Sequence, residues 1–130
     1  MKIFNMSKPC FLTANEAIEL IKQRKLSRYE WVQSCLERIE ERENLTKAWT
    51  YLDIEGSLNQ AKKLDDLNND KFGIPIGAKD IIDVSNMPTQ MGTSFYKDNI
   101  PKRDAASIAI SKNAGCIIIG KTVTTELGHR

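Results

Sequence analysis

Apolar residues in the first part of the chain recur at helical spacing. In residues 13–25 they lie at i, i+3, i+4 and i+7, which places them on one face of a helix. Thr13 and Glu16 form the pattern of a capping box. In this motif the Thr13 hydroxyl accepts from the Glu16 amide, and the Glu16 carboxylate accepts from the Thr13 amide. The pattern therefore predicts a helix that begins after Thr13 and ends near Lys25.

The same two signals recur further along the chain. Ser27 and Glu30 form a second capping box, and the apolar residues after it keep the helical spacing. The aromatic, β-prone residues 48–52 predict a short strand. Residues 55–68 return to helical spacing, so we expect residues 13–69 to be mainly helical.

Glycine and proline mark a change of character in the second half, where six of the seven glycines lie beyond residue 72. Residues 72–84 mix Gly and Pro with apolar β-formers, which predicts a buried strand or two short strands at a close backbone approach. Residues 85–103 are rich in Pro, Thr, Ser, Gly and Asn. They predict a long irregular loop, and loops of that length are often functional.

A helix and a strand are predicted after this loop. Asp104 is a suitable N-cap for a helix over residues 105–114, and Gly115 occupies the position of a C-cap glycine. Residues 116–119 predict a buried strand, and we expect residues 120–122 to leave it. The order of elements indicates an α/β fold with some parallel pairing, in which N-terminal helices pack on the first strands of a mixed sheet.

Composition narrows the class of protein. The chain has 130 residues, of which 41% are hydrophobic and 28% charged, and its net charge is +2. One domain fits this length, and the balanced charge argues against nucleic-acid binding. No apolar run approaches the roughly 20 residues of a membrane helix, and no signal-peptide core is present. Three cysteines and one histidine without metal-ligand spacing argue against a disulfide framework or zinc site, so we expect a cytoplasmic protein.

Residues 115–122 match the phosphate-loop pattern G-x-x-x-x-G-K-S/T. In such a loop, Lys121 would contact the outer phosphates of a nucleotide and Thr122 would bind magnesium. The context argues against this interpretation, because a phosphate loop needs a strand before its first glycine, whereas three consecutive isoleucines here predict a buried strand inside the pattern. A nucleotide-binding protein is therefore an alternative, but a weak one.

Lys79 is the most informative candidate for chemistry, because it lies in an apolar stretch beside Asp80. Burial without a partner would lower the pKa of its amine, and a neutral amine can act as a base. The ordinary alternative is a lysine that reaches water from a strand end or forms an ion pair. The pattern alone favours this alternative.

The surrounding residues carry a resemblance to a known family. Residues 72–84 closely resemble the segment G-I/V-P-I/V-x-V/A/I-K-D-x-x-D-V of the amidase signature family, and residues 88–94 resemble its P-T-x-x-G-S stretch with Thr93 inserted. Residues 104–106 and 113–126 are similar to its D-A and A-G-A-I/V-I/V-x-G-K-T-x-x-x-E blocks. The resemblance extends from about Leu12 to Leu127.

The resemblance implies amide hydrolysis by a Ser–cis-Ser–Lys triad, a lysine variant of the serine triad. Lys79 matches the catalytic lysine, so we expect an uncharged amine, buried against apolar neighbours, that would deprotonate the bridging serine. The implied substrate is a small-molecule carboxamide, and no metal or other cofactor is implied. Five further matching residues are expected to support the Lys79 segment and the loop by hydrogen bonds, namely Asp80, Thr89, Asp104, Lys121 and Glu126.

Both serines of the family lie in a Gly/Ser-rich stretch downstream of the last matching block, and residues 1–130 contain no such stretch. We therefore expect the N-terminal part of one amidase signature domain, helical over 13–69 and α/β over 72–130, that is inactive alone. A complementary chain or self-association would then cover its open surfaces. A non-catalytic module that binds a protein partner is the other alternative.

Overall fold

Two capping boxes begin the first two α-helices of the computed structural model, which describes residues 8–67 and 70–129. In α1 (Ala14–Lys22) and α2 (Arg28–Thr46), the N-cap hydroxyl and the carboxylate three residues later bond as predicted. A short 3-10 helix, η1 (Pro9–Phe11), packs on α2. The capping signal is local in sequence, which is why it predicts both starts correctly.

The end of α1 differs from the prediction by three residues. The helix ends at Lys22 rather than Lys25, because Arg24 adopts a left-handed backbone with φ of 57°. The Lys25 amide then donates to the Leu20 carbonyl at 2.8 Å, which closes the helix end. Residues 68 and 69, the end of the predicted helical part, and Arg130 lie outside the described residues.

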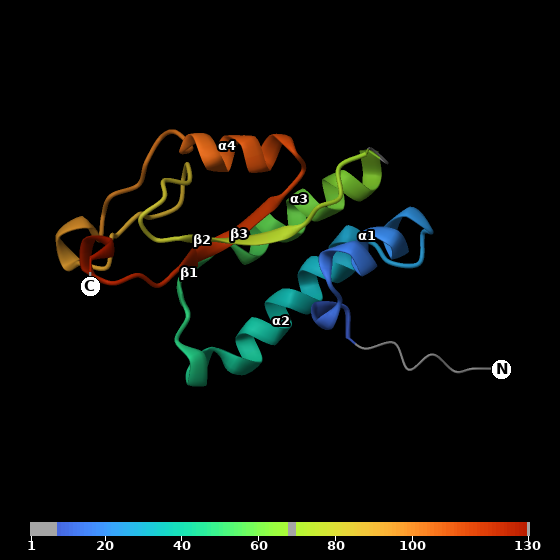
Figure 1. Ribbon diagram of the computed structural model, residues 1–130, viewed down its shortest axis with the longest axis horizontal. Coiled ribbons are helices and arrows are strands. Elements are labelled where there is room, and N and C mark those ends of the chain that lie inside the picture. Colours follow the sequence, from blue (N-terminus) through green and yellow to red (C-terminus); the bar gives the residue numbers. More distant parts are fainter. Residues whose placement is uncertain (1–7, 68–69, 130) are drawn as a thin grey trace.

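Three strands form a mixed sheet in the order β1-β3-β2 (Figure 1). The central strand β3 (Ile117–Thr122) pairs antiparallel with β1 (Trp49–Leu52) and parallel with β2 (Pro75–Lys79). This confirms the predicted α/β fold with a mixed sheet. The expectation that residues 120–122 leave the strand is wrong, because β3 continues to Thr122 with all but its last residue buried.

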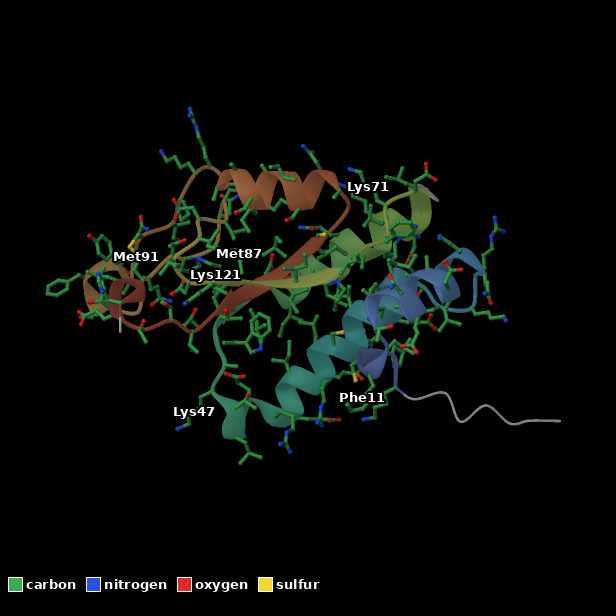
Figure 2. All side chains as sticks on the ribbon, in the orientation of Figure 1. Phe11, Lys47, Lys71, Met87, Met91 and Lys121 are labelled. Carbon is green, nitrogen blue, oxygen red and sulfur yellow. The ribbon has the colours of Figure 1, made fainter. Side chains whose placement is uncertain are left out.

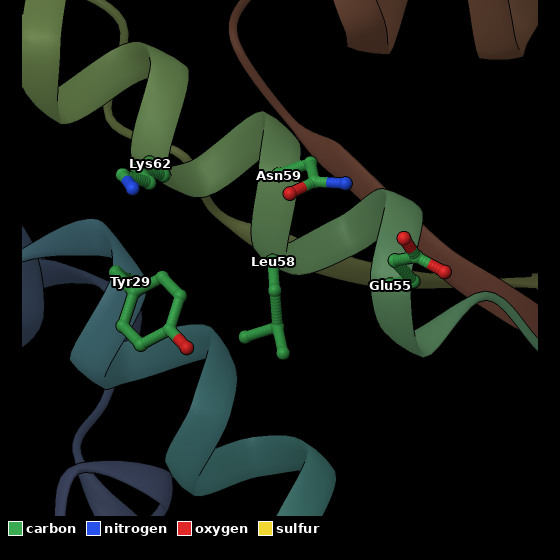
Figure 3. Close-up of a pocket in the computed structure, with 5 residues that line it drawn as sticks. All are labelled: Tyr29, Glu55, Leu58, Asn59 and Lys62. Atoms are coloured by element: carbon green, nitrogen blue, oxygen red, sulfur yellow. The ribbon is translucent and has the colours of Figure 1, made fainter.

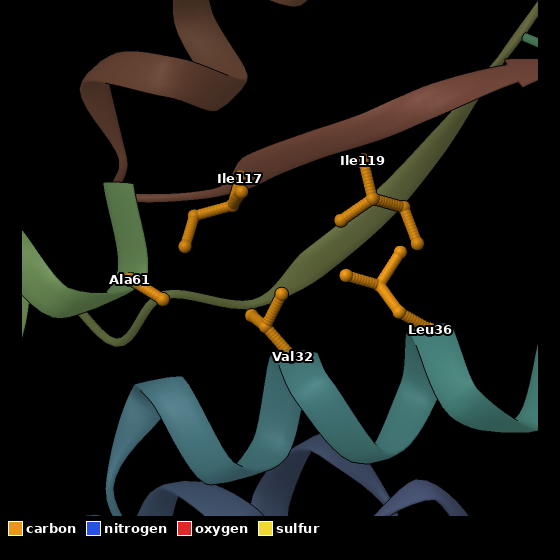
Figure 4. Close-up of a cluster of buried hydrophobic side chains, with 5 residues drawn as sticks. All are labelled: Val32, Leu36, Ala61, Ile117 and Ile119. Carbon is orange, nitrogen blue, oxygen red and sulfur yellow. The ribbon is translucent and has the colours of Figure 1, made fainter. Parts of the chain in front are cut away.

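Helices cover both faces of this sheet. α2 and α3 (Ile54–Leu67) lie on one face and α4 (Ala106–Asn113) on the other (Figure 1). The three isoleucines of β3 alternate between the two faces of the sheet. Ile117 and Ile119 pack toward α2 and α3, and Ile118 packs toward α4. The first cluster consists of Val32, Leu36, Ala61, Ile117 and Ile119 (Figure 4).

The start of α4 corrects one prediction. Asp104 is not its N-cap, because that position is Ala105 and no side chain caps the helix. The Asp104 carboxylate instead accepts from the Ser85 amide at 2.7 Å and from Lys112 at 2.8 Å, so it fastens the long loop to α4. Partial burial raises the pKa of Asp104, but the hydrogen bonds from Lys112 and Ser85 outweigh it and hold the pKa below its ordinary value.

Candidate active site

A β-bulge decides which face of the sheet receives Lys121. The pairing of β2 with β3 skips Ile119, and beyond that point Ala78 pairs with Lys121. Ala78 belongs to the cluster under α4. The bulge therefore turns Lys121 toward that face, whereas strict alternation from Ile117 would turn it toward α2 and α3.

The Lys121 amine is enclosed in a polar cluster at the end of the sheet where the loops gather (Figure 2). It donates to Asp80 Oδ1 at 3.0 Å, to Thr89 Oγ1 at 2.9 Å and to the Pro88 carbonyl at 3.0 Å. The side chains of Lys121, Asp80 and Thr89 are fully buried. All three donors of the ammonium group thus have an acceptor, which is the condition under which a buried charge is tolerated.

Asp80 connects this cluster to the loop. Both carboxylate oxygens accept from the Gln90 amide at 3.2 Å, and the Asp80 carbonyl accepts from the Met91 amide at 3.0 Å. The Asp80 amide donates to the Thr122 carbonyl at 2.9 Å. One buried residue therefore ties the ends of β2 and β3 to residues 88–91.

Two turns pack together beside this cluster. Residues 90–93 and 126–129 are each closed by a hydrogen bond between their first and last residues, and both central residues of each have positive φ. Non-glycine residues are uncommon in such turns, so the surrounding structure must hold them. One hydrogen bond joins the two turns, because the Leu127 amide donates to the Met91 carbonyl at 2.7 Å. The φ angles are 55° at Met91, 68° at Gly92, 49° at Leu127 and 70° at Gly128.

Lys79 lies at the end of β2, next to this cluster in the sequence, but on the other face of the sheet. Alternation along β2 puts the exposed Lys79 opposite the buried Ala78 and Asp80. The expectation that its amine is buried among apolar neighbours is wrong for the described residues. The physical reason is that β2 is an edge strand with β3 on one side only. Gly77 and Lys79 therefore have fewer neighbouring side chains to cover them than residues of the central strand.

The five predicted supporting residues divide into two groups. Asp80, Thr89 and Lys121 meet in the buried cluster. Asp104 instead pairs with Lys112 of α4, and the exposed Glu126 belongs to the second turn, η3 (Glu126–Gly128). The sequence analysis missed the Pro88 carbonyl and the Gln90 amide. These are backbone groups, and no residue type in the sequence signals them.

The nucleotide-binding alternative is contradicted by β3. Gly120 and Lys121 lie inside the strand rather than in a loop open to phosphates. The Lys121 amine donates all its hydrogen bonds to acceptors within the cluster. Among the described residues no group of three metal-ligating side chains occurs, and no helix there is long and apolar enough to span a membrane.

Neither of two partly buried thiols is a candidate nucleophile. Burial raises the pKa of the Cys35 thiol to about 11, with a further contribution from Cys10, and burial also raises the pKa of Cys116. Both groups therefore remain protonated near neutral pH.

A groove between α2 and α3 lies apart from these residues. Its volume is about 470 Å³. None of the predicted site residues lines it, so the groove does not extend the candidate site. Its lining consists of Tyr29, Glu55, Leu58, Asn59 and Lys62 (Figure 3).

Comparison with known proteins decides the family. The family model described as Amidase matches residues 30–129. The chain belongs to the amidase family. It is 39% identical over 125 residues to the A subunit of glutamyl-tRNA(Gln) amidotransferase from Lawsonia intracellularis, covering 93% of this chain and 26% of that protein.

Solved structures of amidases share the fold. An amidase family protein from Bacillus anthracis superposes with a TM-score of 0.81 at 29% identity, over 89% of this chain and 25% of that one. Peptide amidase from Stenotrophomonas maltophilia gives a TM-score of 0.83 at 24% identity, over 92% of this chain and 26% of that one. This amidase chain thus spans about a quarter of the length of the relatives it matches.

Proposed function

We propose that this chain supplies Lys79 as the base of a Ser–cis-Ser–Lys triad that hydrolyses a carboxamide. The Lys79 amine takes a proton from the bridging serine, which takes one from the nucleophilic serine as that oxygen attacks the amide carbon. The C–N bond breaks, the amine leaves with a proton, and water hydrolyses the acyl-enzyme. Backbone amides of the Gly/Ser-rich stretch stabilise the oxyanion.

One observation carries this proposal. Lys79 is exposed at a strand end whose next residue, Asp80, is held by the fully buried cluster with Lys121. The backbone that carries the amine is therefore fixed, while the amine itself is accessible to a second polypeptide. A base needs both properties, because proton transfer requires hydrogen-bond distance and a defined geometry.

The same proposal assigns both serines to a polypeptide segment other than residues 1–130. These residues form the N-terminal part of one amidase domain, and the base alone contributes little, because triad members act as a unit. We infer that residues 1–130 by themselves hydrolyse no amide. The described cysteines are free, which fits a cytoplasmic location.

Co-expression tests this assignment. Residues 1–130 are produced with the portion of the Lawsonia intracellularis amidotransferase chain that follows its matched segment, and hydrolysis of simple carboxamides is measured. We expect turnover by the complex and none by residues 1–130 alone. Lys79→Met should lower kcat by about a thousandfold or more.

Lys63→Met is the matched control, since Lys63 is an exposed lysine on α3 away from the sheet end. It should leave kcat unchanged. Equal turnover by the Lys79 and Lys63 variants would contradict the assignment, and so would Lys79-dependent turnover by residues 1–130 alone.

A further inference from the structure

One row of residues crosses the sheet from β1 to the proposed base. Thr122, in the central strand β3, pairs with Trp49 of β1 on one side and with Lys79 of β2 on the other. Residues paired directly on neighbouring strands have their side chains on the same face, about 5 Å apart. The Lys79 side chain therefore leaves the sheet on the same face as the side chains of Thr122 and Trp49, which is the face that α2 and α3 cover.

The Trp49 ring occupies the space that a side chain at Gly77 would need. A Cβ at Gly77 would lie 2.6 Å from Trp49 Cη2 and 3.0 Å from Trp49 Cζ3. It would also lie 3.0 Å from Thr122 Cγ2. The far edge of the indole therefore extends past β3 and lies against the backbone of β2, two residues before Lys79. Glycine weakens a strand, and its presence at position 77 is explained by this close approach of the ring.

Hydrogen bonds hold the backbone of Lys79 but not its side chain. The Ile82 amide donates to the Lys79 carbonyl at 2.9 Å, and the Asp80 amide donates to the Thr122 carbonyl at 2.9 Å. Neither bond sets the direction of the flexible four-carbon stem, and Lys79 is exposed. A lysine stem gains a defined direction when it lies along apolar surface while the amine stays in water. The indole edge at Gly77 provides apolar surface on the face from which the stem leaves.

We propose that Trp49 is a positioning residue for the base, because its indole edge supports the aliphatic stem of Lys79 and directs the amine. This inference rests on the proposed function. Trp49 acts through Lys79 and takes no proton itself. A displacement of a reacting group by about 1 Å can lower the rate on the order of a hundredfold. Trp49 therefore contributes to kcat, whereas KM does not depend on it.

Proton chemical shifts of the lysine methylene groups test the contact in residues 1–130 alone, without the serines. An aromatic ring changes the shifts of protons that lie beside it. We expect the Lys79 methylene signals to differ from those of the exposed Lys63 and to move toward them in Trp49→Phe, whose shorter ring does not extend to Gly77. Trp31→Phe is the matched control, because Trp31 is buried in the cluster with α1. It should leave the Lys79 signals in place.

A pair of compensating variants tests the effect on the reaction. The probe is the complex of residues 1–130 with the segment of the Lawsonia intracellularis amidotransferase chain described above. Gly77→Ala displaces the indole edge and Trp49→Phe removes it, so each should lower kcat about tenfold and leave KM within about twofold. In the double variant the new methyl group fills the space that the ring leaves, and kcat should recover to within about threefold of wild type. Trp31→Phe should change neither constant.

Three outcomes would overturn the inference and leave the proposed function intact. The first is a Lys79-dependent complex whose kcat does not change in Trp49→Phe. The second is a loss of kcat in the double variant that equals the sum of the two single losses, because a merely structural role of Trp49 predicts that result. The third is a set of Lys79 methylene signals that Trp49→Phe leaves in place. Turnover that survives Lys79→Met would instead contradict the proposed function, even where the shifts show the contact.

Discussion

Two ion pairs with little solvent exposure, Arg28 with Asp65 and Lys121 with Asp80, use the same chemistry for different purposes. Asp65 of α3 pairs with Arg28 at 3.3 Å and accepts the Arg28 and Tyr29 amides, each at 3.0 Å. It therefore caps α2 from a neighbouring helix. Asp80 pairs with Lys121 and accepts amides of a loop, and both side chains are fully buried.

The difference lies in what each carboxylate holds. Asp65 joins two helices that their apolar faces already bring together, and it retains 23% of its side-chain exposure. Asp80 holds residues 90 and 91 of the long loop, directly behind the residue proposed as the base. A fully buried pair costs much to break and fixes geometry, whereas a partly exposed pair mainly adds stability.

The largest effect is expected at the buried pair. Lys121→Met leaves the Asp80 carboxylate buried without its cation, so the free energy of unfolding should fall by about 3–5 kcal/mol. Urea denaturation measures this. Lys112→Met is the control, because it removes a more exposed ammonium group that pairs with Asp104 and should cost about 1 kcal/mol or less. Equal losses for the two variants would contradict the distinction.

Removal of Asp65, the α3 residue that caps α2, should lower the free energy of unfolding by a smaller amount. Asp65→Ala takes an acceptor from two amides in the first turn of α2 and the partner of Arg28, so we expect a loss of about 2 kcal/mol. The exposed neighbour Asp66 offers a control, and Asp66→Ala should change stability by less than about 0.5 kcal/mol. A loss at Asp65 as large as that at Lys121 would remove the contrast between the pairs.

A pH dependence is expected at Asp104, which joins the loop to α4. Its pKa is lower in the folded protein than its ordinary value of 3.8, so its carboxylate stabilises the fold above that pH. This contribution is lost as the pH falls through the folded pKa. The stability difference between wild type and Asp104→Asn should thus be full at about pH 6 and shrink below about pH 4.

Unfolding by urea across this pH range measures the difference. Asp98→Asn, which alters an exposed carboxylate in the same loop, serves as the reference. A difference between wild type and Asp104→Asn that stays constant from pH 6 to pH 3 would contradict the account of Asp104.

The smallest effect is expected at the end of α1. Arg24 holds a left-handed backbone with φ of 57°, which costs a residue with a Cβ more than it costs glycine. Arg24→Gly should stabilise the protein by roughly 0.5 kcal/mol, since the relief of strain exceeds the added entropy of the unfolded chain. Thermal unfolding measures this, and a lower melting temperature would show that the Arg24 side chain matters more than its backbone.

Features set by residues close in sequence were predicted correctly, whereas features set by residues far apart in sequence were not. The starts of α1 and α2 were predictable because Thr13 with Glu16 and Ser27 with Glu30 act within four residues. The family pattern brought Asp80, Thr89 and Lys121 into consideration, and the structure joins them. The place of Lys121 was not predictable, because a bulge at Ile119 determines it and no residue type signals a bulge.

Long-range pairing also explains the error at Lys79. The family resemblance suggested a buried amine at Lys79, but exposure depends on whether a strand lies at the edge of the sheet. Only the assembled order of the strands shows that β2 is an edge. Similarly, the position of Asp104 predicted a helix cap, yet its carboxylate accepts from the amide of Ser85, which lies 19 residues away in sequence.

The ratio of kcat between the Lys63→Met and Lys79→Met variants of the co-expressed complex tests the assignment of the base most directly. With hydrolysis of a simple carboxamide as the measurement, we predict a ratio of about a thousand or more. A ratio near one in an active complex would show that the amine at the open end of β2 takes no part in the chemistry.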